Sequence, residues 1–190
     1  MALYLVVGLG NPGPKYTETR HNAGFMLVER LAKRWDTEWT LARRFEARMA
    51  KVKRGGQRVL LCQPQTYMNA SGEALRAVVD YHRMPRPLSG LLVVVDDADL
   101  PLGEIRMRRG GSSGGHHGLE SVAQHLGTRE FPRLRVGIGR QTGVREITGH
   151  VLGQFNRTEA ELFERVLSRA ADAVECWLSR GLAQAMNQFN

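Results

Sequence analysis

Apolar and polar residues follow one another along the chain in short blocks that predict interleaved strands and helices. Uninterrupted apolar runs at residues 3–7 and 91–95 predict buried strands, and the second reads as a central strand covered on both faces. Helical spacing of apolar residues predicts a helix over 25–35 and a long one over about 158–179. The long helix is expected to bury one face, made of Leu162, Phe163, Val166, Ala170, Val174 and Trp177.

The rest of the chain continues this alternation. Residues 45–53 and 58–62 flank the turn sequence RGGQ (54–57) and predict a hairpin. Two further strands are expected at 105–109 and 133–139, and two further helices at about 71–79 and 119–126. No repeat or linker divides the sequence. The predicted fold class is therefore α/β, with one domain over residues 1–190 and a twisted mixed β-sheet flanked by helices on both faces.

Composition places the chain among ordinary globular proteins. A hydrophobic fraction of 42% in 190 residues is enough for a sizeable core, and no apolar stretch approaches the ~20 residues of a membrane helix. The N-terminus lacks the features of a signal peptide. Cys62 and Cys176 have no metal-binding spacing, so we expect reduced core thiols. These features predict a cytoplasmic protein with no membrane partner.

The charge adds a candidate partner. The net charge is +8, and arginine supplies most of it because lysine occurs only at 15, 33, 51 and 53. The excess gathers in residues 30–58 and 105–145. The second segment carries Arg106, Arg108, Arg109, Arg129, Arg133, Arg135, Arg140 and Arg145. The planar guanidinium suits phosphate oxygens, so composition leaves open either a polyanionic partner or a solvated arginine-rich surface.

The sequence GLGNPG (8–13) directly follows the first predicted strand and matches the GxGxxG pattern of dinucleotide-binding folds. That fold needs a turn leading straight into a helix, whereas Pro12 and Pro14 prolong this loop. It also needs an acidic residue closing a second strand, and Glu29 lies inside a predicted helix instead. We therefore expect the loop region to present Asn11 and His21 to a ligand other than a nicotinamide cofactor.

His21 and Asp96 form the candidate catalytic pair. Asp96 follows the apolar run 91–95, so it should emerge at a strand's carboxyl end, as the 8–13 loop does. A carboxylate within reach of His21 would fix its tautomer and stabilise the imidazolium formed when the ring accepts a proton. The alternatives are a structural histidine and, for DDAD (96–99), a turn, a capping segment or a divalent-ion site. No second acidic cluster or HxH pair completes a metal set, so we expect no metal.

Other polar and aromatic residues could complete a substrate site. The amides of Asn11 and Asn69 are suited to orienting water or binding a developing oxyanion, although both are also normal turn residues. Tyr16, Tyr67 and Met68 would form a wall for a base or terminal adenine, with core packing an equal alternative for Met68.

The glycine-rich loop 110–118 contains GxSxG at 111–115, the pattern of a serine-hydrolase nucleophile. In that class the acid and the histidine follow the serine, whereas here the best acid precedes it. Because Arg106, Arg108 and Arg109 flank this loop, it suits phosphate binding better.

Taken together, these segments resemble the bacterial peptidyl-tRNA hydrolase family. The matching stretches occur in the family's order over nearly the whole chain. They are VGLGNPG (7–13), TRHNAG (19–24), PQTYMNASG (64–72), DDADLPLG (96–103), the loop through Gly118 and Leu119, and FPRLRVGIG (131–139).

The resemblance implies hydrolysis of the ester that joins a peptide to the 3′ end of tRNA. It implies that His21 is the general base, that Asp96 orients it, and that Asn11 and Asn69 hold substrate, water or oxyanion. Arg106, Arg108 and Arg135 would grip the tRNA acceptor stem and its 5′ phosphate. It further implies no cofactor, a monomer, and a role in translation and ribosome rescue in the cytoplasm.

One position departs from the resemblance. The family commonly has His-Asn-Gly where this chain has His116-His117-Gly118. His117 therefore replaces a neutral amide, thought to help position substrate and water, with a titratable ring.

Two alternatives from other classes stay open. A plant organellar branch resembling this family serves intron splicing, so an RNA-binding module without hydrolysis is possible on the same scaffold. The intact His21 and Asp96 favour the enzyme. The other alternative, a dinucleotide-dependent enzyme or serine hydrolase, rests only on the two partial motifs.

Overall fold

The computed structural model describes residues 1–140 and 147–190, so Arg145 lies outside the described residues. The strands are β1 (Leu3–Gly8), β2 (Thr40–Ala42), β3 (Ala47–Arg54), β4 (Gln57–Pro64), β5 (Leu91–Asp97), β6 (Ile105–Arg108) and β7 (Arg133–Gly137). The α-helices are α1 (Ala23–Arg34), α2 (Ser71–Tyr81), α3 (His117–Leu126), α4 (Ile147–Val151), α5 (Arg157–Arg180) and α6 (Leu182–Phe189). Four 3-10 turns are η1 (Pro14–Tyr16), η2 (Arg20–Asn22), η3 (Arg43–Phe45) and η4 (Met68–Ala70).

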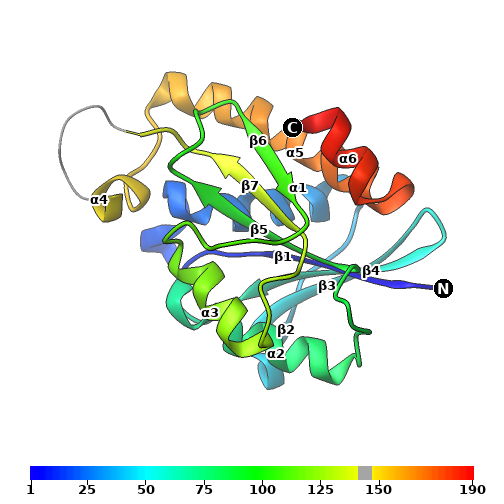
Figure 1. Ribbon diagram of the computed structural model, residues 1–190. Helices are drawn as coiled ribbons and strands as arrows, with labels where there is room; N and C mark the ends of the chain where they lie inside the picture. Colours follow the sequence, from blue (N-terminus) through cyan, green and yellow to red (C-terminus); the bar gives the residue numbers. More distant parts are fainter. Residues whose placement is uncertain (141–146) are drawn as a thin grey trace.

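The strands form one mixed sheet in the order β2-β3-β4-β1-β5-β7-β6 (Figure 1). β1 pairs in parallel with β4 and with β5, and β5 pairs in parallel with β7. The pairs at both margins, β2–β3–β4 and β6–β7, are antiparallel. The parallel centre brings the carboxyl ends of β1, β5 and β7 to one edge of the sheet, where ligands of open α/β sheets bind.

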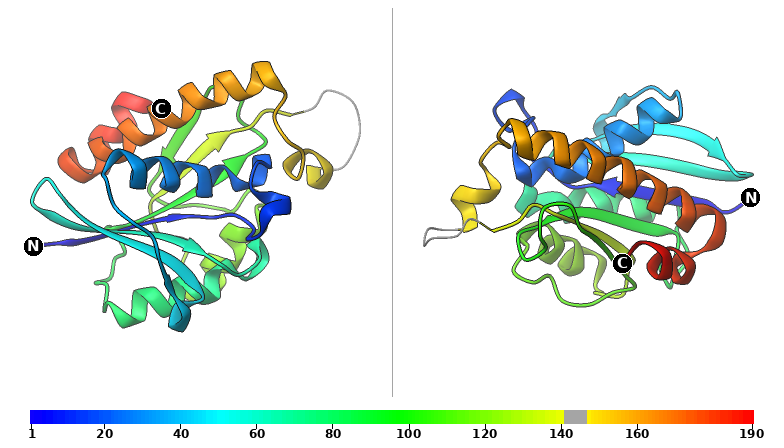
Figure 2. Two further views of the ribbon diagram at one scale, coloured as in Figure 1. Left: turned by 180° about the vertical axis from the view of Figure 1, so that it is seen from behind. Right: turned by 90° about the horizontal axis from the view of Figure 1, so that it is seen from above.

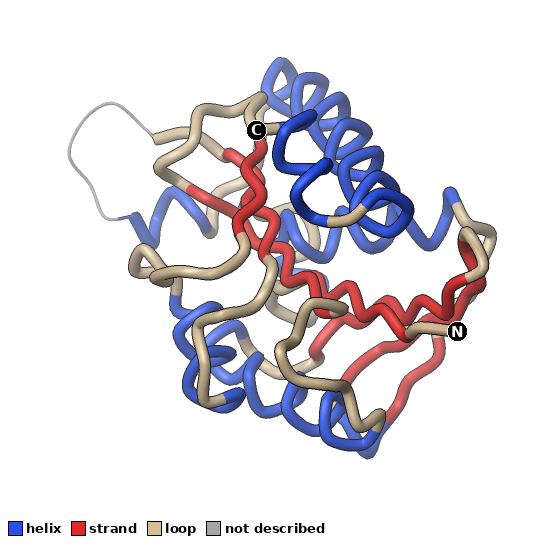
Figure 3. The backbone as a smooth tube through the Cα atoms, turned by 45° about the vertical axis from the view of Figure 1, so that its right-hand side comes forward, coloured by secondary structure: helices blue, strands red, loops and turns tan. Residues whose placement is uncertain are grey.

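Helices cover both faces of the sheet (Figures 1 and 2). On one face, α1, α5 and α6 pack over inward-pointing residues such as Val6, Val94 and Leu134. On the other, α2 and α3 pack over Val7 and Val95. The tube view shows the strands as a layer between these helices (Figure 3). β5 is buried on both faces, which explains its uninterrupted apolar sequence.

The predicted fold class and the predicted strands are confirmed, with boundaries shifted by a few residues. The predicted buried face of the last long helix is wrong at one position. Leu162 is 39% exposed, while Leu167 belongs to the core. The buried face of α5 includes Phe163, Val166 and Ala170. Leu162 lies about 100° around the helix from Phe163 and so falls outside this face. The short elements β2, α4 and α6 were not predicted.

Close packing accounts for two glycines of the sequence motifs. A Cβ added at Gly8 would lie 2.1 Å from the carbonyl oxygen of Gly24, and one at Gly24 would lie 2.5 Å from the backbone nitrogen of Leu9. Only glycines let the start of α1 cross the end of β1 this closely. These glycines therefore set the position of the loop between β1 and α1, which carries Asn11 and His21.

Two further expectations concern the cysteines and the membrane. Both cysteines are free thiols, and burial raises the pKa of Cys62 to about 12, so this thiol is unreactive. Cys176 is only partly buried. None of the described helices is long and apolar enough to cross a membrane.

Candidate active site

A cavity of about 340 Å³ opens at the carboxyl ends of β1 and β5. It brings together most of the side chains singled out in the sequence, although they come from five separate segments of the chain. Its lining includes Asn11, His21, Tyr67, Met68, Asn69, Asp96, His117 and Arg135. Tyr16, Arg106 and Arg108 do not line it.

His21 and Asp96 contact each other directly, as the sequence predicts. Nδ1 of His21, in η2, lies 2.8 Å from Oδ1 of Asp96, near the end of β5. The Asp96 side chain is 2% exposed and that of His21 is 13% exposed. The carboxylate is thus held in the sheet, while the ring reaches the cavity.

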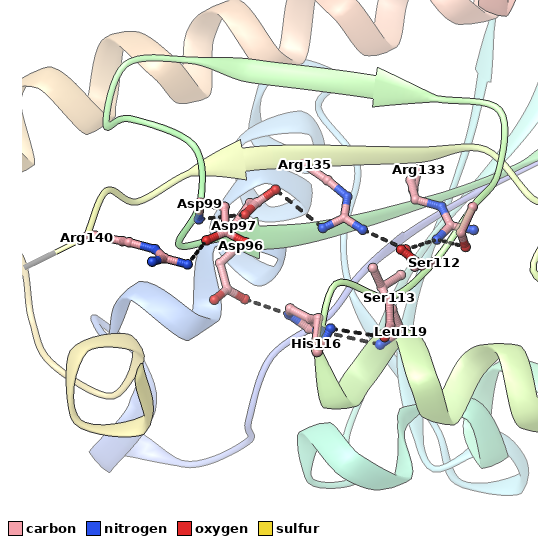
Figure 4. Close-up of polar contacts among 12 residues, drawn as sticks. Asp96, Asp97, Asp99, Ser112, Ser113, His116, Leu119, Arg133, Arg135 and Arg140 are labelled. Atoms are coloured by element: carbon pink, nitrogen blue, oxygen red, sulfur yellow. Dashed lines mark hydrogen bonds and ion pairs between the residues drawn. The ribbon is translucent and has the colours of Figure 1, made fainter. Parts of the chain in front are cut away.

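A second histidine, His116, binds the same carboxylate oxygen (Figure 4). Its Nδ1 accepts a hydrogen bond from the backbone nitrogen of Leu119 at 3.2 Å and so caps α3. In the neutral ring the proton is therefore on Nε2, which donates to Oδ1 of Asp96 at 2.9 Å. Sequence reasoning missed this residue, because histidine is not a favoured N-cap type.

The two rings determine the charge of Asp96. Burial alone would raise the pKa of Asp96, but the hydrogen bonds and charges of His116 and His21 outweigh it and lower that pKa to about 2. At neutral pH the side chain of Asp96 is therefore a carboxylate, and it accepts a hydrogen bond from a protonated nitrogen of each ring. In the neutral ring of His21, the proton is then on Nδ1 and Nε2 is unprotonated, which is the form that a general base needs.

Asn11 is held by hydrogen bonds that engage its side-chain oxygen and its backbone. Its Oδ1 accepts from the backbone nitrogen of Met68 at 2.8 Å, and its backbone nitrogen and oxygen both bond to the side chain of Asn22. With the oxygen engaged, the side-chain NH₂ remains available at the cavity. It suits an acceptor such as a water oxygen or an oxyanion.

The other predicted substrate residues lie around this centre. Met68 is 4% exposed and packs in the core, and it also lines the cavity, so its contact with a substrate stays a prediction. Asn69 and His117 are exposed at the cavity. Tyr67 is 61% exposed, and the ring of Tyr16 packs edge-on against it with centroids 6.3 Å apart.

The predicted arginines lie on one face of the β6–β7 pair, where Arg106 is opposite Arg135 and Arg108 is opposite Arg133. Arg135 donates to Asp97 at 3.3 Å and to the carbonyl of Ser112 at 2.9 Å, which ties the glycine-rich loop to the cavity (Figure 4). Among the described residues, Arg106 and Arg108 have no carboxylate partner.

Arg133 is buried and holds backbone carbonyls of the loop, such as that of Gly111 at 2.9 Å. Its burial and the neighbouring charge of Arg135 lower its pKa to about 10, which leaves it charged at neutral pH.

The aspartates and the serine that suggested other chemistry have local roles. Oδ1 of Asp97 accepts from the backbone nitrogen of Asp99 at 2.8 Å, so this pair forms a turn as expected. The Ser113 hydroxyl donates to Glu120 at 3.1 Å and accepts from the backbone nitrogen of Gly115. The GxSxG sequence therefore stabilises a loop and the start of α3.

His21, Asp96 and His116 place three possible ligand atoms within 4.8 Å of one another, the spacing of a metal site. To bind a metal through Nε2, the neutral His116 ring would have to move its proton to Nδ1 and give up the bond that caps α3. The hydrogen-bonded arrangement thus favours protons over a metal between these groups.

The site combines an imidazole that a buried carboxylate orients with an amide donor, at the carboxyl edge of an α/β sheet. Hydrolases that activate water use this arrangement of groups. A family profile described as peptidyl-tRNA hydrolase matches residues 5–190. The chain therefore belongs to the peptidyl-tRNA hydrolase family, whose members are ester hydrolases.

Individual relatives agree with this assignment. The peptidyl-tRNA hydrolase of Synechococcus sp. (strain JA-2-3B'a(2-13)) is 52% identical over 100% of this chain and 84% of the relative. That of Bacillus subtilis (strain 168) is 44% identical over 99% of this chain and 98% of the relative. The crystal structure of peptidyl-tRNA hydrolase from Acinetobacter baumannii has a TM-score of 0.91 at 35% identity, covering 98% of this chain and 93% of that one.

Two substitutions of His116 should distinguish how much each of its two contacts contributes to stability. His116→Ala removes both the cap and the bond to Asp96, and should lower the free energy of unfolding by about 2–4 kcal/mol. His116→Asn can still cap α3 but is too short to reach Asp96, so its loss should be smaller by about 1 kcal/mol. Urea unfolding of both variants measures this difference. Equal losses would show that the bond to Leu119 does not stabilise α3.

Proposed function

We propose that this protein hydrolyses the ester bond between the peptide and the 3′-terminal ribose in peptidyl-tRNA, releasing free peptide and reusable tRNA. The observation that carries the proposal is the 2.8 Å contact between His21 and the buried Asp96 in a member of this family. The proposal also places the protein in the cytoplasm, where translation supplies this substrate. It acts there as a monomer.

The mechanism begins with a water molecule at the unprotonated Nε2 of His21. The ring takes a proton as the water oxygen attacks the ester carbonyl, and the negative Asp96 stabilises the imidazolium. The carbonyl oxygen becomes an oxyanion, to which the NH₂ of Asn11 donates. When the tetrahedral intermediate collapses, the ribose oxygen leaves and takes the proton from His21. These steps use only water and protein side chains.

The exposed residues around the cavity position the substrate in this proposal. Tyr16, Tyr67 and Met68 provide a wall for the terminal adenine, and Asn69 and His117 contact the ester-linked aminoacyl group. Tyr67 supports the first role because this residue is 61% exposed and lines the cavity.

Arg106, Arg108 and Arg135 bind acceptor-stem phosphates in this proposal. For Arg108→Ala we expect tRNA binding to weaken and the slope of log affinity against log salt to fall by about one unit. Arg157→Ala is the matched control, since that side chain is 95% exposed at the start of α5, outside this cluster. Filter binding across a salt series measures both slopes. An unchanged slope in Arg108→Ala would contradict a phosphate contact.

Release of the blocked amino acid from N-acetyl-aminoacyl-tRNA by the purified protein tests the proposal. The alternative function, RNA binding without chemistry, gives tight binding and no release. The intact pair of His21 and Asp96 favours release.

A further inference from the structure

A second hollow, of about 850 Å³, lies beside α1 and is not used by the chemistry described above. We call it the α1 groove. Its walls come from the loop after β1, from α1, from the end of β4 and from α5. Phe25 and Met26 are partly exposed apolar side chains in it, and Gln65 is a partly exposed amide side chain.

The α1 groove adjoins the catalytic cavity. Asn11 lines both hollows, so the two meet at this residue. The segment after β4 also runs from one to the other, because Gln63 and Gln65 line the groove while Tyr67, Met68 and Asn69 line the cavity. A chain that leaves the cavity past Asn11 enters the groove.

We propose that the α1 groove binds the peptide part of the substrate, beyond the residue joined to tRNA. This inference rests on the proposed function. The cavity of about 340 Å³ accommodates the ester and its immediate neighbours, so the rest of the peptide needs another surface. Apolar side chains next to amide groups suit an extended peptide of varied sequence.

Ion pairing distinguishes a surface that suits a peptide from a surface that suits RNA. In the α1 groove, Arg48 pairs with Glu29 at 2.9 Å and Arg30 pairs with Glu164. Arg34, at the far end, pairs with Asp172 at 2.7 Å. Each of these cations shares its charge with a carboxylate, so the α1 groove attracts phosphates less than do the arginines on β6, which have no carboxylate partner in the described part of the chain.

Arg106 and Arg108, by contrast, have no carboxylate partner among the described residues and lie on the β6–β7 margin of the sheet. Arg135 links that margin to the catalytic cavity. The RNA then approaches from the β6–β7 side and the peptide leaves on the α1 side.

The length of the groove sets the number of residues it can hold. The 12 residues of α1 span about 18 Å, which corresponds to about five residues of extended chain. Lys33 lies near the far end and, within the part of the chain described, has no ion-pair partner. An acidic residue about five to seven positions from the ester should therefore bind best in the wild type.

A charge reversal tests the proposal. KM is measured for N-acetyl-aminoacyl-tRNA and for two octapeptidyl-tRNAs, with either Asp or Lys at positions five to seven from the ester. Lys33→Glu should raise KM for the acidic octapeptide and lower it for the basic one, each about three- to fivefold. It should leave KM for the short substrate equal to that of Lys53→Glu. This control has the same charge change on β3, outside the groove.

Three other results would contradict either the groove proposal or the proposed function. An equal shift of all three substrates in Lys33→Glu beyond that in Lys53→Glu would show that the groove contacts RNA, and would overturn the proposal. Unchanged KM values for both octapeptides would also overturn it. Failure of the wild type to hydrolyse even the short substrate would instead refute the proposed function.

Discussion

His21→Ala should lower kcat for release of the blocked amino acid by about 10²–10⁴-fold, because it removes the imidazole that the buried Asp96 orients at the cavity. The methyl group cannot accept a proton from water, whereas the cavity and the arginines stay intact. KM should therefore change far less than kcat. Steady-state kinetics on N-acetyl-aminoacyl-tRNA measures both constants.

His82→Ala is the matched control, because this half-buried histidine follows α2 and does not line the cavity. It should keep wild-type kcat. Melting temperatures of the two variants show whether a loss comes from unfolding. A folded His21→Ala protein with kcat within threefold of wild type would remove His21 from the chemistry.

Asp96→Asn should have an effect of similar size, with kcat reduced by about 10²–10⁴-fold. The neutral amide cannot stabilise the imidazolium, and its NH₂ can favour the wrong tautomer of His21. Asp96→Glu keeps the charge but moves it by one methylene in a site that is 2% exposed, so it should retain more activity than Asn. Equal activity of the two variants would show that the charge of Asp96 is not what matters.

The same substitution should change the response of stability to acid. The pKa of Asp96 is about 2 in the folded protein against an ordinary value of 3.8, so its carboxylate stabilises the fold above pH ~4. That contribution is lost as the pH falls toward 2. Asp96→Asn should therefore lose less unfolding free energy than wild type between pH 4 and pH 2. Urea unfolding at several pH values measures the difference, and identical slopes would contradict the lowered pKa.

The sequence could predict that His21 and Asp96 lie together because their positions follow from strand topology. Asp96 ends an uninterrupted apolar run and His21 follows the first strand, and parallel neighbours such as β1 and β5 end at the same edge. The glycines of GLGNPG were harder to interpret. Gly8 looks like part of a phosphate-binding turn, yet it serves the close approach of α1.

His116 and the α1 groove could not be predicted, for a common reason. Both depend on contacts between segments far apart in the chain. His116 reaches Asp96 only because α3 begins beside β5, and the groove needs α1, β4 and α5 together. Local patterns also place Leu162 wrongly, since periodicity gives a helix face only to within about one residue.

The most direct test of whether His21 is the general base is the pH dependence of single-turnover hydrolysis. Wild type and His21→Ala are each used in excess over N-acetyl-aminoacyl-tRNA. The wild-type rate should rise with pH and then level off, as expected for a reaction that depends on one protein base. The small rate of His21→Ala should rise with hydroxide concentration and not level off. A variant that shows the same levelling curve as wild type, within tenfold of its rate, would contradict the account.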